Sequence, residues 1–303
     1  MDEKINTIII PIIRTDFIER CLETLYKYTE ENFYVYVVDQ TPHGIYDKIK
    51  DKIHMYLRPY RNLGFAKAIN TGIRIADTPY ITFMNDDVEC VNKAWFQGIM
   101  DTFEKHGEKV LAVNPMSCKE AGWGYGWPAD KYVEILPYKE TYTQEDYDWL
   151  MEGDFSSVRD RLPATCSFQR KGTVVDGIAM WCPIFKRETF QKFGLLHERF
   201  YPGGGEDYDY NAKVYSHGYR FLSTSTSWVY HHWSSSKGAG MGENNTEEVQ
   251  MQIDPKRAWN SLGENWPPAI NEGHDLDIWG FYTNTKGERV PYQRAPVSDI
   301  VSL

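Results

Sequence analysis

A short acidic sequence follows an apolar run in the first third of the chain. The run YITFM, residues 80–84, predicts a buried strand, and Asn85, Asp86 and Asp87 come directly after it. Carboxylates at the end of a strand suit Mg²⁺ or Mn²⁺, which take oxygen ligands and share them with substrate phosphates. A solvated turn after a strand carries the same residue types. The acids by themselves therefore leave a metal site and a turn open.

The loop RPYRNLG, residues 58–64, is a second candidate. It carries Arg58 and Arg61 and ends at Gly64, where the predicted helix 65–76 begins. The positive end of a helix dipole beside two cations attracts an anion such as a phosphate. An ordinary connection between a strand and a helix has a similar composition, so the loop gains weight only together with other features.

Two more polar clusters lie in the second half of the chain. The sequence GGGEDYDY places Glu206 and Asp207 in the first turn of a predicted helix, where the dipole favours ionised carboxylates. A carboxylate beside a bound acceptor can act as a general base, although acids in a first turn also cap helices. His231 and His232 lie at the end of a predicted strand. A neutral imidazole can complete a metal site, and such histidines are also common structural residues.

The elements that position these residues alternate between strand and helix. Apolar runs predict strands, and the amphipathic segments between them predict helices, the first behind a capping box of Asp16 and Glu19. The alternation predicts a doubly wound, mainly parallel α/β sheet, whose ligands bind beyond the carboxyl ends of the strands. Asp39, the 58–64 loop and the acids after residue 84 all fall at that edge. The predicted strands are 6–13, 33–38, 53–57, 80–84 and 109–113, and the later helices are 43–51, 65–76 and about 95–103.

The second half of the chain predicts a different organisation. Residues 114–172 interrupt the alternation with turns and a short helix, so we expect an insertion over the active edge of the sheet. The polar tail from about residue 237 is expected to wrap the domain or to form a lid. The elements predicted between them are a bent strand or strand pair at 173–185, a short helix at 186–193, a helix from about Glu206 and a strand at 225–233.

Composition and charge exclude several classes of function. The 303 residues are 42% hydrophobic and carry a net charge of −10, which argues against binding nucleic acid or anionic membranes through bulk charge. The longest apolar run is far shorter than the roughly 20 residues of a membrane-spanning helix, and no signal peptide is recognisable. Five widely spaced cysteines without a CxxC pattern indicate reduced thiols. We therefore expect a cytoplasmic globular protein.

Several of these motifs occur in the order and spacing of a known family. IIIPIIR, VVDQT, RNLGFAKAINTGI, FMNDDVE, DGIAMWCPIFKRETF, GGGEDYDYNAKVYSHGYRF and WVYHHWSSS resemble the family 2 glycosyltransferases. The resemblance implies a GT-A fold over residues 1–236, with a mixed, mainly parallel α/β sheet flanked by helices. Residues 1–113 would form the nucleotide-binding half and 173–236 the acceptor-binding half. The insertion 114–172 and the extension 237–303 have no counterpart in the resemblance.

The resemblance also implies an activity. It is the inverting transfer of a sugar from a nucleotide sugar, usually a UDP-sugar, to an acceptor hydroxyl with the help of Mn²⁺ or Mg²⁺. Asp87, the last acid of a D-x-D motif, would bind the ion, and His231 would complete the coordination, with His232 as the alternative. The usual first aspartate is Asn85 here, which puts coordination by two carboxylates in doubt. The residues implied on the donor side are Pro11, Ile13, Arg14, Asp39, Asn62, Gly64, Lys67, Asn85 and Asp86.

On the acceptor side, the resemblance makes Asp207 the catalytic base of a single in-line displacement, in which it takes the proton of the acceptor hydroxyl. Glu206 is either an acceptor ligand or a helix cap. For the aromatic cluster at 123–127, a hydrophobic plug is as compatible with the sequence as stacking on a sugar. The residues expected to contact the acceptor or the donor sugar are Asp176, Trp181, Glu206, Trp123 and Trp127.

The acceptor itself is not predicted. A glycan, a lipid-linked glycan, a protein and a modified nucleic acid all stay open, as does the oligomeric state. A sugar-nucleotide-binding scaffold without catalysis would share the fold, but the presence of Asp87 and Asp207 favours an enzyme. A nucleotidyltransferase would need a glycine-rich phosphate loop after the first strand, where this chain has PIIRTD without a glycine.

Overall fold

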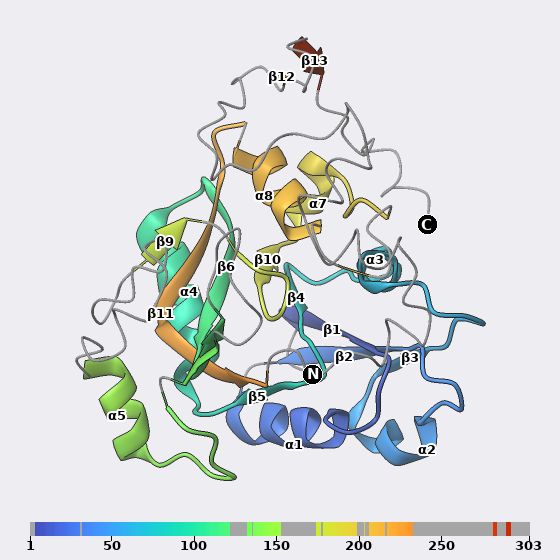
Figure 1. Cartoon of the computed structure of the whole chain (residues 1–303), viewed down its shortest axis with the longest axis vertical. Helices are drawn as coiled ribbons and strands as arrows, with labels where there is room; N and C mark the ends of the chain where they lie inside the picture. The colour runs from blue at the N-terminus through green and yellow to red at the C-terminus, as the bar shows by residue number, and fades with distance from the viewer. Residues whose placement is uncertain are drawn as a thin grey trace.

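The computed structural model describes a sheet domain and parts of the segments around it (Figure 1). The aromatic residues Trp123, Tyr125 and Trp127 and most of the tail 237–303 lie outside the described part, so the sugar contacts expected of Trp123 and Trp127 stay predictions. The described residues are 4–30, 32–121, 132–134, 136–152, 174–176, 178–198, 203, 206–215, 217–232, 281–283 and 289–291.

One large sheet forms the centre of the fold. Its strands are β1 (Asn6–Ile12), β2 (Phe33–Asp39), β3 (Met55–Leu57), β4 (Tyr80–Phe83), β5 (Val88–Cys90), β6 (Val110–Ser117), β9 (Val174–Asp176), β10 (Ile184–Lys186) and β11 (Arg220–His231). They follow the order β3-β2-β1-β4-β10-β6-β11-β5, and β9 pairs with β11. The pairs β3–β2, β2–β1, β1–β4 and β6–β11 are parallel, while β10 lies antiparallel between β4 and β6. The predicted mixed, mainly parallel sheet is confirmed.

Helices cover both faces of this sheet (Figure 1). The helices of the described residues are α1 (Ile18–Tyr28), α2 (Tyr46–Ile49), the short 3-10 helix Lys50–Lys52, α3 (Phe65–Ile73), α4 (Ala94–His106), α5 (Gln144–Glu152), α7 (Glu188–Phe193) and α8 (Glu206–Tyr215), of which α5 lies at the edge of the molecule. Alternating residues of β1 build the two layers, because successive side chains of a strand point to opposite faces. Ile8 and Ile10 belong to the core cluster of α1 and α4, and Ile9 to that of α3, α7 and α8. The continuous apolar run thus fits a strand covered on both sides.

Two small strand pairs lie outside the sheet. They are β7 (Lys119–Ala121) with β8 (Tyr132–Glu134), and β12 (Phe281–Thr283) with β13 (Arg289–Pro291). Within the described residues, no helix combines the length and the apolar character that crossing a membrane requires. Four of the five cysteines are described, and all four are free and buried.

The predicted capping box of the first helix is wrong. Helix α1 begins at Ile18, and the preceding Phe17 makes no side-chain cap bond. The carboxylate of Asp16 instead accepts from the Arg14 guanidinium, at 2.8 Å from Nε. An ion pair within the connection between β1 and α1 has therefore taken the acid that would have capped the helix.

The larger differences from the predicted strands all involve β11, and they are two strand boundaries and one strand that was not predicted. Strand β6 continues to Ser117, because β11 pairs with it as far as that residue, so residues 114–117 belong to the sheet and not to an insertion. Strand β11 begins at Arg220, earlier than predicted. Strand β5 directly follows the acidic turn and pairs antiparallel with the end of β11. A three-residue strand of this kind is defined by its partner and not by a pattern of its own.

Candidate active site

The acidic sequence after β4 forms a buried turn between two strands. The amide of Val88 donates to the carbonyl of Asn85 at 3.2 Å, and the Asn85 amide donates to the carbonyl of Trp181 at 2.8 Å. Asp86 and Asp87 are only 6% and 3% exposed. This burial rules out a solvated turn. Backbone hydrogen bonds thus hold the turn that carries the two carboxylates between β4 and β5.

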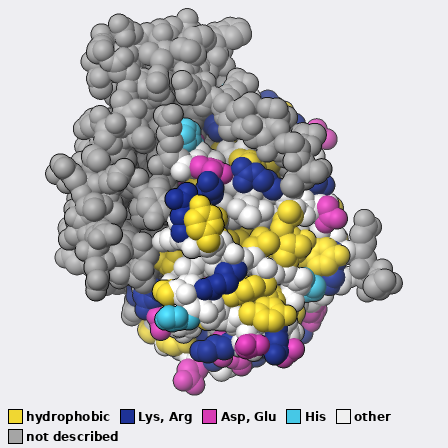
Figure 2. Space-filling model, turned by 90° about the vertical axis from the view of Figure 1, so that its right-hand side faces the viewer, with side chains coloured by type: hydrophobic (Ala, Val, Ile, Leu, Met, Phe, Trp, Pro, Cys, Tyr) yellow, Lys and Arg dark blue, Asp and Glu magenta, His cyan; other side chains and the backbone are white. Residues whose placement is uncertain are grey.

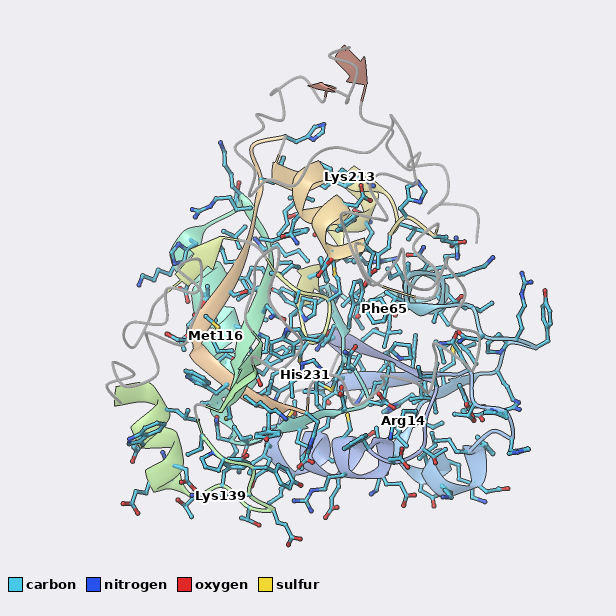
Figure 3. The ribbon with its side chains drawn as sticks, in the orientation of Figure 1. Arg14, Phe65, Met116, Lys139, Lys213 and His231 are labelled. Carbon is cyan, nitrogen blue, oxygen red and sulfur yellow. The ribbon has the colours of Figure 1, made fainter. Side chains whose placement is uncertain are left out.

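His231, the last residue of β11, meets Asp87. Its Nε2 atom lies 3.1 Å from Oδ1 of Asp87 and 3.5 Å from the side-chain nitrogen of Asn85. The imidazole stacks on the Trp181 ring, with centroids 5.0 Å apart and planes 19° apart. Figure 3 shows the labelled His231 in the interior, where β11 approaches β4 and β5. The register of β5 and β11, in which His231 opposes Val88, brings the imidazole to the carboxylate.

His232 has a different carboxylate partner. Its Nε2 atom lies 2.9 Å from Oε1 of Glu89, and its backbone amide donates to the carbonyl of Asp87. Burial would raise the pKa of Glu89, but hydrogen bonds from His232 and Arg20 outweigh it and hold the pKa below its ordinary value. Of the two adjacent histidines, only His231 thus contacts the acids of the turn through its side chain.

Asp86 is held in an unfavourable environment for a charge. Burial and then the neighbouring charge of Asp87 raise the pKa of Asp86 to about 8, against smaller opposing effects of its own backbone amide and of Arg14. Its Oδ2 atom is buried and has no hydrogen-bond partner among the described residues. A buried carboxylate oxygen with no donor is rare in folded proteins, and a bound ion or water is one of its recognised explanations.

Asp39, expected to contact the donor base, uses its carboxylate within its own loop. Oδ1 accepts from the Thr41 amide at 2.8 Å, and Oδ2 accepts from the Ile45 amide at 2.9 Å. Oδ2 also accepts from the Tyr56 hydroxyl and, at 3.5 Å, from the Arg58 guanidinium. The residue is completely buried. In this structure its carboxylate organises the connection from β2 to α2.

The loop before α3 is held by hydrogen bonds of its own amides to side chains, among them that of Leu63 to the Gln40 side chain at 2.7 Å. Gly64 lies at φ +76°, a conformation that favours glycine, and its amide donates to the Asn62 side chain at 2.8 Å. Tyr60 is 89% exposed, and the Arg61 guanidinium lies over its ring. Lys67 pairs with Glu198 at 3.6 Å. Figure 2 views this side of the molecule, where Lys and Arg side chains gather around exposed hydrophobic ones.

Helix α8 carries the expected base. Asp207 is half-buried in its first turn, and Glu206 beside it is 7% exposed. The side chain of Asn211, one turn later, donates to the carbonyl of Asp207 at 2.7 Å and to that of Ile178 at 2.8 Å. Ile178 begins the segment that leads to Trp181. The contacts therefore run from the helix of Asp207 to the ring that supports His231.

The structure does not bring every expected residue to the turn. Asn85, Asp86, Asp87, His231 and Trp181 form one cluster, and Arg14 acts on Asp86 through its charge. Trp181 is 4% exposed, so its ring supports His231 here and does not face solvent. Asp176 pairs with Leu222 at the end of β9, away from the acidic turn along β11. Contacts of these two residues with a sugar stay predictions.

Glu89 belongs to the site region, and sequence reasoning does not identify it as a member. In the sequence it stands only as an acid that flanks the turn, because no local pattern marks β5 as a strand. Spacing gives no usable signal, because strand residues two apart share a face whereas the adjacent residues His231 and His232 lie on opposite faces. Asp87 also precedes β5, so alternation along a strand does not apply to it. The contact of Glu89 with His232 therefore follows only from the long-range pairing of β5 with β11.

The residues of the turn fit a partial site for a hard divalent ion. Among the described residues, no group of three His, Cys, Asp or Glu could hold a metal by itself. Two ligands of one ion, each about 2.1 Å from it and at right angles, lie roughly 3.0 Å apart. The 3.1 Å between Asp87 Oδ1 and His231 Nε2 matches that separation. Such ions also keep waters and take substrate phosphates as further ligands, so two protein ligands are enough.

Comparisons with known proteins identify the family and agree with the fold. Residues 7–165, just over half of the chain, match the model of glycosyl transferase family 2. A mannosyltransferase from Pyrobaculum calidifontis, solved with GDP-Man and Mn²⁺, superposes with a TM-score of 0.51 at 13% identity, over 85% of this chain and 63% of that one. GalNAc-T7, solved with UDP, GalNAc and Mn²⁺, superposes with a TM-score of 0.53 at 14% identity, over 82% of this chain and 47% of that one. No curated protein matches the sequence.

Proposed function

The chain belongs to glycosyl transferase family 2 and has the GT-A fold, and we propose that it transfers a sugar from a nucleotide sugar to an acceptor hydroxyl with inversion. One observation carries the proposal: the Asp87–His231 pair, buried at the carboxyl edge of a mainly parallel sheet, where such sheets bind ligands. The two structural relatives were both solved with Mn²⁺ and with a nucleotide or nucleotide sugar, which supports a metal-assisted reaction.

Asp87 and His231 would hold the divalent ion, with Asn85 beside them. The ion supplies neutralisation of the charge that builds on the departing nucleoside diphosphate. The imidazole is fixed by the stacked Trp181 ring and by the His231 amide, which donates to the Ser117 hydroxyl oxygen at 3.1 Å. Fixed ligands matter because a hard ion of this kind demands a defined geometry. Asn85 cannot add a second charge, so the site differs from one with two ligating carboxylates.

Asp207 would act on the acceptor. Its carboxylate takes the proton from the acceptor hydroxyl, while the oxygen forms a bond to the anomeric carbon and the bond from that carbon to the diphosphate breaks. Attack from the face opposite the leaving group inverts the configuration. The position of Asp207 in the first turn of α8 supports this role, because the helix dipole stabilises the ionised base before proton transfer.

The donor would lie across the carboxyl edge, with its diphosphate near the amide of Gly64 and the cations Arg14 and Lys67. A UDP-sugar is the first candidate, although the two structural relatives carry different bases, guanine and uracil. Asp39 can contact a base only if it exchanges one of its present partners, since both carboxylate oxygens already accept hydrogen bonds from the loop amides, Tyr56 and Arg58. We expect the transferred group to be a hexosyl group, and the proposal assigns no acceptor class.

The proposal is tested by thermal shift with a panel of nucleotide sugars, with and without Mn²⁺, followed by a transfer assay. A ligand at a concentration of about 100 times its dissociation constant stabilises the native state by roughly 2.7 kcal/mol, so a true donor is readily detected. Asp207→Asn should retain the Mn²⁺-dependent shift and lose transfer. Asp47→Asn, the same change in the first turn of α2, should lose neither.

Two results would count against it. Loss of donor binding in Asp207→Asn would make Asp207 a structural residue. If no nucleotide sugar shifts the wild-type protein with Mn²⁺, the activity itself is not the one proposed.

A further inference from the structure

Glu89 is a buried carboxylate with partners from three separate segments. Oε1 accepts from the Tyr138 hydroxyl at 3.1 Å and lies 2.9 Å from Nε2 of His232. Oε2 accepts from Nε of Arg20 at 3.1 Å. The residue is only 4% exposed. Helix α1, the end of β11 and the segment 136–152 therefore meet at one side chain, outside the Asp87–His231 pair.

The strand register links this cluster to the turn. In the pairing of β5 with β11, His231 opposes Val88 and Tyr230 opposes Glu89, and the His232 amide donates to the carbonyl of Asp87. A slip of β11 by one residue along β5 would turn its side chains to the other face of the sheet. The same register therefore sets both the contact of His231 with Asp87 and that of His232 with Glu89. The hydrogen bond that fixes His232 on Glu89 therefore also helps to fix His231 on Asp87.

The surroundings of His232 strengthen its hydrogen bond with Glu89. Its imidazole lies between the rings of Phe17, Tyr138 and Tyr230, with centroid distances of 4.8, 4.9 and 4.9 Å. A hydrogen bond to a charged group is stronger where water is excluded, and leaving a buried charge without its partner is costly. The contact with Glu89 is therefore a firm attachment of the β11 end.

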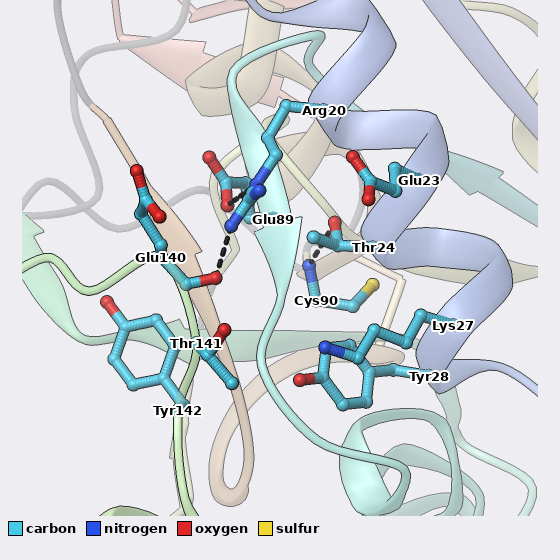
Figure 4. A pocket seen from close by; sticks show the side chains of 10 residues that line it. All are labelled: Arg20, Glu23, Thr24, Lys27, Tyr28, Glu89, Cys90, Glu140, Thr141 and Tyr142. Atoms are coloured by element: carbon cyan, nitrogen blue, oxygen red, sulfur yellow. Dashed lines mark hydrogen bonds and ion pairs between the residues drawn. The ribbon is translucent and has the colours of Figure 1, made fainter.

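The segment 136–152 attaches to the same point. Tyr138 bonds to Glu89 and packs on Tyr230 at 5.0 Å, and Arg20 donates to the carbonyl of Glu140. Figure 4 shows Arg20 bridging from α1 to Glu89 on one side and to Glu140 on the other. The docking of this segment is thus coupled to the carboxylate that also holds His232.

We propose that Glu89 is a positioning residue for the Asp87–His231 pair, and that its bond to Tyr138 makes the affinity of this pair for a divalent ion depend on the docking of segment 136–152. The inference rests on the metal role proposed above. Glu89 touches neither substrate nor metal in this scheme. It acts through the backbone register of β5 and β11.

The experiment measures the affinity for Mn²⁺ alone, by isothermal titration of the full chain. Glu89→Gln keeps the size and removes the charge, and we expect about tenfold weaker binding, the usual effect of losing an outer partner of a metal site. Tyr138→Phe removes one hydroxyl from a part-exposed ring, and we expect roughly threefold weaker binding. This second variant keeps the proposal testable if Glu89→Gln fails to fold.

Tyr142→Phe is the matched control. Tyr142 lies in the same segment, but its hydroxyl contacts only Pro137 and Lys139 within the described hydrogen bonds. Its loss should leave the Mn²⁺ affinity unchanged. The double variant of Glu89→Gln and Tyr138→Phe should bind Mn²⁺ no more weakly than Glu89→Gln alone, since both changes act through one contact.

Three results would overturn the inference. Wild-type affinity in Glu89→Gln, even with a lower free energy of unfolding in EDTA, would make Glu89 merely structural. Equal weakening by Tyr138→Phe and Tyr142→Phe would assign the effect to the segment as a whole. If the wild-type protein does not bind Mn²⁺, the proposed metal site is wrong and the inference is wrong with it. Either of the other two results would overturn the inference and leave the proposed metal site unaffected.

Discussion

Two strand ends at the same edge of the sheet carry buried aspartates with opposite environments. Asp39 at the end of β2 accepts two backbone amides and the side chains of Tyr56 and Arg58. Asp86 after β4 has a buried oxygen without a described hydrogen-bond partner, and Asp87 beside it faces an imidazole. Both ends are nearly inaccessible to solvent.

The difference comes from the segment after each strand. After β2, the chain folds back in a loop whose amides at Thr41 and Ile45 reach the carboxylate. After β4, the turn of residues 85–87 runs directly into β5, and the amide that acts on the Asp86 carboxylate is that of Asp86 itself. An acid that closes its own loop is structural, and a buried acid with an oxygen that lacks a donor is available for a ligand.

The strongest test of this contrast removes the carboxylate that is proposed to bind the metal ion. Asp87→Ala should abolish the Mn²⁺ dependence of donor binding and reduce transfer about a thousandfold, because a metal at the leaving group is worth several kcal/mol. The free energy of unfolding in EDTA should change little, since the loss of the contact with His231 is offset by removal of the charge that raises the pKa of Asp86. Transfer rates and Mn²⁺ titrations check both parts. Donor binding that still responds fully to Mn²⁺ would show that the ion is held elsewhere.

Substitution of Asp39, the structural aspartate, should instead lower the free energy of unfolding. Asp39→Asn places an amide nitrogen against donors, and the loss of a buried, hydrogen-bonded charge opposite Arg58 should cost about 3 kcal/mol of unfolding free energy. Urea unfolding measures this, with Tyr56→Phe as the control that removes a single donor.

A different outcome would bear on the donor base. If Asp39→Asn raises the dissociation constant for the donor far more than Tyr56→Phe does at equal stability, Asp39 contacts the base as the family resemblance implies. The contrast between the two strand ends would then be one of degree.

The sheet was predictable from sequence because its signals are local. Continuous apolar runs such as Ile8 to Ile12 predict strands buried on both faces, and helical spacing in α1 and α4 predicts their cover. The acidic turn, the base helix and the two histidines are all candidates by residue type and position. Local sequence patterns were therefore enough to identify most of the candidate site residues.

The rest could not be predicted because it depends on partners far away in sequence. Strand β5 exists only by pairing with β11, about 140 residues later, and the same pairing decides that His231 and not His232 meets Asp87. The loop bonds of Asp39 were equally invisible, since an acid after a strand reads the same whether or not its loop folds back. Long-range register and local hydrogen bonding, and not residue type, separate the two aspartates.

Asp86 gives the comparison its finest test, because the change used for Asp39 should have the opposite sign here. Burial, and then the charge of Asp87, raise the pKa of Asp86 from 3.8 to about 8. Between these values the folded protein binds more protons than the unfolded chain, so the free energy of unfolding falls as pH rises, by at most about 1.4 kcal/mol per unit.

Asp86→Asn removes this contribution and should stabilise the metal-free protein by on the order of 2 kcal/mol at pH 7.5, with little change at pH 4. Urea unfolding in EDTA at both pH values measures it, and Asp51→Asn on the surface should change neither. The same substitution should weaken donor binding in the presence of Mn²⁺, because the ion and the donor favour the charge that the metal-free protein disfavours. An unchanged pH slope would mean that Asp86 is already satisfied in the folded protein, and the two strand ends would then no longer differ in kind.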